Sequence, residues 1–132
     1  MEPTADAAAP IDAPPPVPVE AAIDLKHLAR MTLGERSLEA EVLRLFDRQA
    51  AVLLDHMRQA APQAVAAFAH TLKGSARGIG AWRVAAAAET VEIEAARQDA
   101  GEVAGAVARL AVAVDEARAV IAAWLEPHIC SG

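Results

Sequence analysis

The residues from His70 to Ile79 carry the side chains of this sequence that are best suited to chemistry. They read His-Thr-Leu-Lys-Gly-Ser-Ala-Arg-Gly-Ile, and they belong to an apolar pattern of helical period. A neutral imidazole near pH 7 has a free nitrogen lone pair, so it can accept a phosphoryl group without a separate base. A cation one helical turn away would attract the negative charge of that group. The spacing suits transient phosphorylation of His70, and by itself it fits an ordinary solvated histidine equally well.

A helical wheel separates the core face of this segment from its outer face, because an α-helix turns about 100° per residue. With Val65 at zero, an apolar face lies within about 60° of it. That face holds Phe68, Ala69, Leu72, Ala76 and Ile79. His70 falls at about 140°, and Lys73, Gly74 and Arg77 fall at about 80°, 180° and 120°. We expect these four residues to form one outward surface, called the His70 surface below.

Gly74 is the residue of the His70 surface that costs stability. Glycine inside a helix loses about 1 kcal/mol relative to alanine, and alanine is abundant elsewhere in the chain. A side chain at position 74 would stand beside His70, whereas glycine leaves room for a second protein to bring a phosphoryl group in line. We expect Gly78 and Gly80 to serve as a helix cap or a tight turn.

The composition favours a single all-helical domain. The chain has 132 residues, of which 55% are hydrophobic, and this suffices for one core. Most of the apolar residues are Ala, Leu and Val, with two Phe, two Trp and no Tyr. Such a composition is typical of a tightly packed helical bundle.

Charge and hydropathy exclude several classes of partner and location. The net charge is −6 and no basic stripe is present, so we expect no binding to nucleic acid. We also expect no membrane-spanning helix, because the longest uncharged stretch of the helical region, 59–72, is short and contains Pro62 and His70. The N-terminus lacks the pattern of a secretory signal. Since the lone Cys130 cannot form an internal disulfide, a cytoplasmic location is favoured.

The spacing of apolar residues after Ile23 predicts five helices. Asp24 is expected to cap a short helix to about 31, and Thr32 with Glu35 has the spacing of a capping box for a long helix that ends near Pro62. Three further helices are predicted over about 63–78, 81–98 and 103–127. Because short turns join the four long helices, we expect an all-α, antiparallel up-and-down four-helix bundle with a short extra N-terminal helix.

The apolar stripes also predict which residues face the core. On the second helix they are Leu38, Val42, Leu45, Phe46, Leu53 and Met57. On the fourth helix they are Trp82, Ala85, Ala88, Val91 and Ala95. The fifth helix has the most regular stripe, with Val103, Val107, Leu110, Val114, Ala117, Ile121 and Trp124.

The chain divides into three parts by composition. Residues 1–22 hold most of the eight prolines and are expected to be a disordered leader or linker, or else a proline-rich ligand for another protein. The bundle is expected over 23–128. Residues 129–132 are expected to be a C-terminal tail.

The stretch His70–Ala76, continued by Ile79 and Gly80, resembles the signature of the histidine-containing phosphotransfer (HPt) domain family of bacterial multistep phosphorelays. The resemblance extends over residues 24–126. It includes Leu43-Arg44-Leu45-Phe46 and Gly80-Ala81-Trp82.

The resemblance implies that His70 is the phospho-accepting residue, that Lys73 assists the phosphate electrostatically, and that Gly74 keeps the surface open. Arg77 occupies a position that the family motif leaves variable. Its expected role in stabilising the phosphate therefore depends on the helical wheel alone.

A phosphocarrier is the function that these observations favour. His70 would attack an aspartyl phosphate on a response-regulator receiver domain, and a second receiver would then take the phosphoryl group. The sequence has no nucleotide-binding loop, so we expect no enzyme activity and no cofactor of its own, with Mg²⁺ supplied by the receiver. We expect a monomer. Two alternatives remain open: an HPt domain of a larger hybrid histidine kinase, and a helical adaptor that carries no phosphate.

The other candidate residues predict no second site. His27, His56 and His128 stand alone, and no Glu-x-x-His pair is present, so we expect no metal site. Glu89, Glu92 and Glu94 are interpreted as a solvated face with Arg83 and Arg97 nearby.

Overall fold

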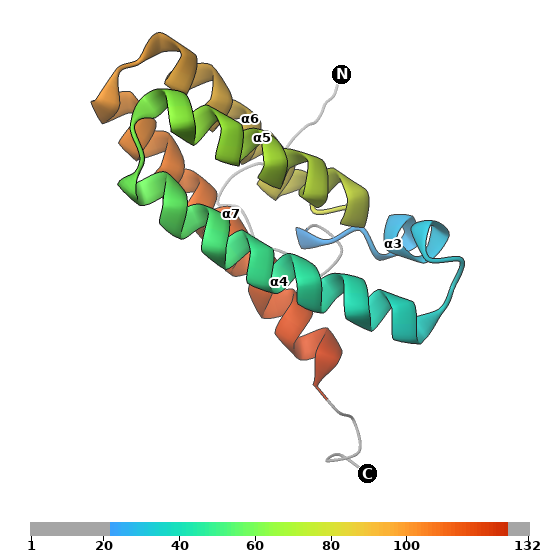
Figure 1. Ribbon diagram of the computed structural model, residues 1–132. Helices are drawn as coiled ribbons and strands as arrows, with labels where there is room; N and C mark the ends of the chain where they lie inside the picture. The colour runs from blue at the N-terminus through green and yellow to red at the C-terminus, as the bar shows by residue number, and fades with distance from the viewer. Residues whose placement is uncertain (1–21, 127–132) are drawn as a thin grey trace, which may run out of the picture.

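The computed structural model describes residues 22–126, which form five α-helices (Figure 1). The short helix α3 spans Leu25–Met31 and precedes α4, which spans Arg36–Gln59. The other helices are α5 over Pro62–Ile79, α6 over Trp82–Arg97 and α7 over Ala100–Leu125. No strand occurs in the described part of the chain, so the all-helical prediction is confirmed. The expected leader and tail lie outside the described residues except for Ala22, which is buried.

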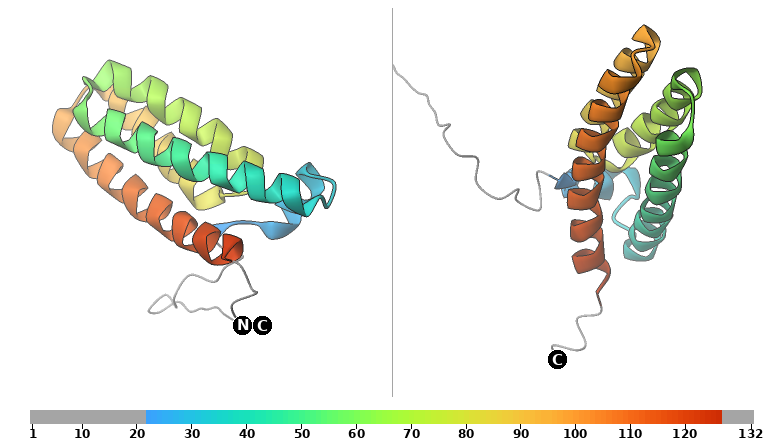
Figure 2. Two further views of the ribbon diagram at one scale, coloured as in Figure 1. Left: turned by 60° about the horizontal axis from the view of Figure 1, so that its bottom comes forward. Right: turned by 90° about the vertical axis from the view of Figure 1, so that its left-hand side faces the viewer.

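The four long helices pack around one hydrophobic core. Each of them contacts the next along the chain, and α4 also contacts α7, so the first and last of the four close the bundle. Only the residues 60–61, 80–81 and 98–99 separate consecutive long helices. Such short connections make each helix return alongside the previous one, as Figure 2 shows from two sides.

The core contains the stripes predicted for α5, α6 and α7, with two exceptions at the helix ends and one in α5, and it also contains one face of α4. The buried residues of α5 are Val65, Ala69, Leu72, Ala76 and Ile79. In α7 all the predicted residues are buried except Trp124, which is partly exposed, as is Phe68 in α5. Buried alanines on α6 allow close approach of its neighbours, so the small side chains favour tight helix packing.

Three residues that the sequence places in the core are exposed instead. The exposed fractions are 45% for Leu38, 58% for Leu45 and 43% for Trp82. The first half of α4 has apolar residues on two faces, and the bundle covers the face that holds Leu43 and Phe46. The prediction for Leu38 and Leu45 is wrong because spacing alone could not choose between these faces.

The prediction of a capping box at Thr32 is also wrong. Thr32 ends α3, and its hydroxyl donates to the carbonyl oxygen of Leu28 at 2.9 Å and to Oε2 of Glu39 at 3.2 Å. The chain then turns through Leu33 and Gly34, which both have positive φ, before α4 begins at Arg36. Thr32 is therefore turned inward, away from the amides that it would have to cap.

Helix α3 lies across the end of the bundle, where Asp24 holds it against α5 and α6. The Asp24 carboxylate accepts from the backbone N–H of His27 at 3.0 Å, which confirms the predicted cap, and from Nε1 of Trp82 at 3.1 Å. The hydrogen bond from Trp82, followed by that from His27, lowers the pKa of Asp24. The backbone N–H of Asp24 donates to the carbonyl oxygen of Gly80 at 2.8 Å. These bonds explain why Trp82 lies outside the core.

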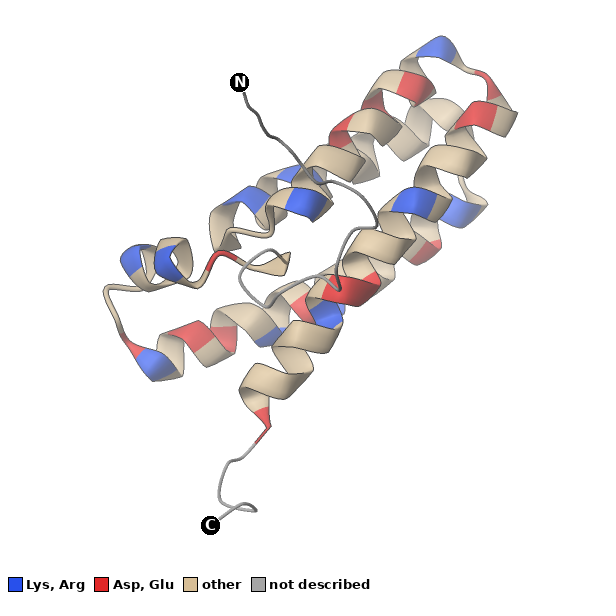
Figure 3. Cartoon of the chain, turned by 180° about the vertical axis from the view of Figure 1, so that it is seen from behind, with Lys and Arg blue, Asp and Glu red and all other residues tan. Residues whose placement is uncertain are grey.

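Basic and acidic residues are both distributed along the helices, as the colours of the cartoon in Figure 3 show. None of the helices in residues 22–126 is long and apolar enough to cross a membrane.

Candidate functional site

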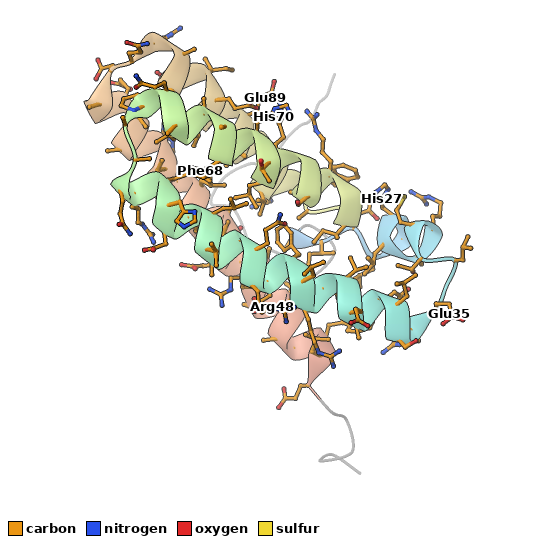
Figure 4. All side chains as sticks on the ribbon, in the orientation of Figure 1. His27, Glu35, Arg48, Phe68, His70 and Glu89 are labelled. Carbon is orange, nitrogen blue, oxygen red and sulfur yellow. The ribbon has the colours of Figure 1, made fainter. Side chains whose placement is uncertain are left out.

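His70 lies in the middle of α5 and is exposed, as the helical wheel predicts. Its side chain is 70% exposed, while Ala69 and Leu72 beside it in the sequence are fully buried. Figure 4 shows His70 and Glu89 along the edge where α5 and α6 lie side by side. The imidazole is thus accessible to a partner and adjacent to a second helix.

The nearest charged group to His70 comes from α6. Oε2 of Glu92 lies 2.9 Å from Nδ1 of His70, and Oε1 of the same carboxylate lies 2.6 Å from Nζ of Lys73. The side chains of Lys73 and Glu92 are only 15% and 23% exposed. One half-buried carboxylate therefore joins the two residues that the sequence places on the His70 surface.

The interpretation of Glu92 as part of a solvated face is wrong. A signal for its true position does exist in the sequence, because a helical hairpin places residues at similar distances from its turn side by side. The turn is at 80–81, so residues 70–73 of α5 come opposite residues near 90 of α6. The rotation of the two helices about their axes then decides which side chain of α6 points toward His70. The hairpin alone does not determine that rotation.

Arg77 is also paired with a glutamate of α6. Its Nη2 atom lies 3.6 Å from Oε1 of Glu89, and the two side chains are 55% and 52% exposed. An ion pair this exposed contributes at most about 1 kcal/mol to stability. Both cations of the predicted surface are therefore neutralised in this structure, Lys73 tightly and Arg77 loosely.

The environment of Glu92 has opposing effects on its ionisation. Burial raises the pKa of the Glu92 carboxyl, whereas the hydrogen bonds and charges of Lys73 and His70 lower it. The second effect is stronger, so the pKa of Glu92 lies below its ordinary value. The carboxylate is consequently ionised at neutral pH.

Gly74 borders open space. A Cβ atom built on Gly74 would have no neighbour within 4 Å, and the same is true of Gly78. Packing within the chain therefore does not require glycine at position 74. An alanine would fit there and would favour the helix by about 1 kcal/mol.

An apolar groove lies on the other side of α5 from Glu92. It has a volume of about 330 Å³, and we call it the α4 groove. Its principal lining residues are Leu28 and Met31 of α3, Leu38, Val42 and Leu45 of α4, and Ser75, Gly78 and Ile79 of α5. The apolar residues of α4 that are absent from the core thus form one wall of a surface groove.

The remaining histidines are not near this site. The ring of His27 packs against that of Trp82, and the ring of His56 packs against that of Phe68, with centroids 4.9 and 5.1 Å apart. Within residues 22–126, no three His, Cys, Asp or Glu side chains are close enough to hold a metal ion. His128 and Cys130 lie outside the described residues.

The fold and the site define a small helical protein with an exposed histidine on α5, beside α6. The family model of the Hpt domain matches residues 41–123, which include the His70 surface, Glu92 and most of the bundle. Because this match covers more than half of the chain, the protein belongs to the Hpt domain family, and the resemblance noted in the sequence is confirmed. Comparison with curated proteins and with solved structures gives no match.

Proposed function

We propose that this domain is a phosphocarrier that moves a phosphoryl group between the aspartates of response-regulator receiver domains through His70. The observation that carries the proposal is the exposed imidazole at the centre of α5, in a chain of the Hpt domain family, with open space at Gly74 beside it. Histidine phosphotransfer in phosphorelays is the activity that this family implies. The antiparallel up-and-down arrangement of the four long helices would present His70 on a rigid surface.

The chemistry requires little from this chain beyond the imidazole. A ring nitrogen attacks the phosphorus of an aspartyl phosphate in line with the bond to the aspartate oxygen, and that bond breaks as the new bond forms. The lone pair is already available, so no base in this protein has to remove a proton. The same path in reverse delivers the phosphoryl group to a second receiver.

The residues around His70 would assist by binding charge. Lys73 and Arg77 are close enough along α5 to approach a phosphoryl group on His70, but Lys73 must first leave Glu92. The Mg²⁺ and most of the groups that stabilise the transition state are expected from the receiver. The domain would then act as a carrier and not as an independent enzyme.

The α4 groove would form the part of the docking surface that gives affinity. Leu38 and Leu45 are exposed there, and Gly78 lines the groove one turn beyond Gly74 on α5. A receiver that covers both the groove and Gly74 would bury apolar side chains while its aspartate faces His70. We expect the domain to act in this way as a cytoplasmic monomer, in contact with receivers or a hybrid histidine kinase.

Phosphotransfer from a receiver tests the proposal directly. The full chain is incubated with a ³²P-phosphorylated receiver from the same organism, and label on this chain is measured. We expect acid-labile, alkali-stable label that is lost in His70→Gln and kept in His56→Gln, because His56 is an exposed histidine of α4 in the same bundle. A wild-type chain that binds receivers but is never labelled by any of them would identify an adaptor instead.

A second candidate is an Hpt domain that belongs to a larger hybrid histidine kinase. The chemistry of His70 would be the same, and the difference lies in the donor. Rates of transfer from each receiver of the organism would separate the two cases, because a domain of a hybrid kinase should prefer that kinase's own receiver.

A further inference from the structure

We propose that Leu33, in the turn between α3 and α4, is an anchor residue that a receiver domain covers when it docks on this protein. The inference rests on the proposed function and names one contact of its docking surface. Two observations carry it. Leu33 has a backbone conformation that leucine rarely adopts, and its side chain is 89% exposed.

The turn after α3 is a Schellman motif in which leucine stands where glycine is usual. The N–H of Gly34 donates to the carbonyl oxygen of Ala29 at 2.9 Å, and the N–H of Leu33 donates to that of Arg30 at 3.4 Å. The residue that follows the C-cap Thr32 is therefore left-handed, with a φ of 56° at Leu33. A side chain in this conformation is crowded by its own backbone, which costs stability that glycine would not lose.

No packing in the described part of the chain offsets this cost. The Leu33 side chain is more exposed than any other large apolar side chain in residues 22–126. An exposed leucine by itself needs no explanation, but here glycine would avoid the cost, and a glycine already follows at position 34 with a φ of 77°. An unfavourable conformation without a contact inside the molecule indicates a contact outside it.

Leu33 extends the α4 groove at the end of the bundle. The groove is lined by Met31 on one side of Leu33 in the sequence and by Leu38 on the other, and these side chains are 59% and 45% exposed. The facing wall is α5 and includes Ser75, little more than one turn after His70. A partner that covers the groove and Leu33 therefore lies next to His70, as the receiver must.

The charges of α3 favour the same partner. Helix α3 has two exposed cations, Lys26 and Arg30, one turn apart, and it has no acidic residue. A receiver that carries an aspartyl phosphate and the carboxylates of a Mg²⁺ site presents negative charge around that site. An apolar anchor beside complementary charges is typical of the residues that dominate binding at protein interfaces.

The first experiment compares stability and receiver binding in Leu33→Gly. We expect the melting temperature to rise by roughly 4–8 °C, because glycine accepts the positive φ without crowding. We expect the dissociation constant for a receiver, measured by titration calorimetry, to rise about tenfold or more, because the apolar side chain is missing. Damage to the fold cannot explain weaker binding by a more stable variant.

Three further variants separate the backbone from the side chain. Gln98→Gly changes the other non-glycine residue of positive φ in residues 22–126, at 61°, where α6 turns into α7 at the opposite end of the bundle (Figure 1). It should raise the stability and leave receiver binding unchanged. Leu33→Met keeps an apolar side chain and should bind like the wild type. Leu33→Asn, which tolerates this conformation, should bind as weakly as Leu33→Gly.

The kinetics of transfer test whether Leu33 acts in docking and not in chemistry. Because Leu33 lies outside the His70 surface, we expect the transfer rate at saturating phosphorylated receiver to be the same in Leu33→Gly and in the wild type. The receiver concentration that gives half of this rate should rise about tenfold.

The outcomes distinguish this proposal from the proposed function. Equal receiver affinity in Leu33→Gly and the wild type would overturn the role of Leu33, even when His70 is phosphorylated. Loss of self-association in sedimentation, with receiver binding unchanged, would assign Leu33 to a contact between copies and would also overturn it. If receivers bind through Leu33 but never label the chain, the proposed function is refuted and the anchor stands. If no receiver binds the wild type, both are refuted.

Discussion

Lys73 and Glu92 form an ion pair between α5 and α6, with Nζ 2.6 Å from Oε1. The lysine that is expected to bind the phosphoryl group is thus held by a carboxylate when His70 is unmodified. A phosphoryl group on His70 brings about −1.5 to −2 charges and competes with Glu92 for this lysine. Under the proposed function, phosphorylation of His70 would therefore weaken this contact between the two helices.

Removal of Lys73 should slow phosphotransfer more than it weakens the fold. In Lys73→Ala we expect transfer from a receiver to be about tenfold slower, because one charge-assisted contact to the phosphate is lost. The free energy of unfolding should fall by about 1 kcal/mol or less, since the pair is partly exposed. Lys26→Ala, an exposed lysine of α3, is the matched control. Equal rates in the two variants would show that Lys73 is a surface charge without a role in transfer.

Replacement of Gly74 by alanine should stabilise the protein and slow transfer. The added Cβ meets nothing within 4 Å, so the helix gains about 0.5–1 kcal/mol without a clash inside the chain. The methyl group would nevertheless stand where the receiver approaches His70. Gly105→Ala on α7, where the new Cβ has an ordinary contact at 3.7 Å, controls for the gain in helix stability. We expect thermal unfolding to show higher stability in both variants, and transfer assays to show a lower rate only in Gly74→Ala. An unchanged transfer rate in Gly74→Ala would contradict the proposal that glycine keeps His70 accessible.

A charge in the α4 groove should weaken receiver binding and leave the fold intact. Leu45 is 58% exposed, so Leu45→Asp should change the stability by no more than about 0.5 kcal/mol. We expect the dissociation constant for a receiver, measured by titration calorimetry, to rise about tenfold or more. Val112→Asp places the same charge at a residue of α7 that is 59% exposed. Should both variants bind the receiver equally well, the groove is not part of the docking surface.

The decrease of the free energy of unfolding at acidic pH should depend on Glu92. Its pKa is lowered from the ordinary value of 4.5. The stabilisation is therefore fully present above that value and is lost as the pH falls through the lower pKa of the folded state. In Glu92→Gln this contribution is absent, so the free energy of unfolding from urea titrations should fall less steeply between about pH 5 and 3. Parallel curves for the variant and the wild type would contradict the lowered pKa.

Gly80 should be the least replaceable glycine of the site region. It ends α5 with a φ of 82°, and a Cβ there would lie 2.9 Å from both the Cβ and the carbonyl oxygen of Asp24. We expect Gly80→Ala to cost about 1–3 kcal/mol from the backbone conformation alone. Gly78→Ala, which is helical and meets nothing within 4 Å, should gain stability instead. The urea midpoints of unfolding of the two variants measure these changes in stability. A loss of stability in Gly78→Ala as large as in Gly80→Ala would contradict the role assigned to the positive φ of Gly80.

Much of the fold could be predicted because the apolar period of a helix is a local property. The stripes of α5 and α7 gave the correct core faces, and Asp24 was correctly assigned as a cap. The errors at Leu38, Leu45 and Thr32 have a common origin. Each residue has two plausible local roles, and packing decides between them: the bundle covers the other face of α4, and the Thr32 hydroxyl bonds Leu28 and Glu39 instead of capping a helix.

The sequence by itself determined that the chain is helical, that His70 faces outward and that Gly74 lies beside it, because these depend only on position along one helix. The tertiary structure alone decided that Glu92 meets both His70 and Lys73 and that exposed leucines of α4 form a groove next to α5. Contacts of this kind depend on how neighbouring helices are shifted and rotated. Packing of the whole core sets these shifts and rotations, and no single helix contains them.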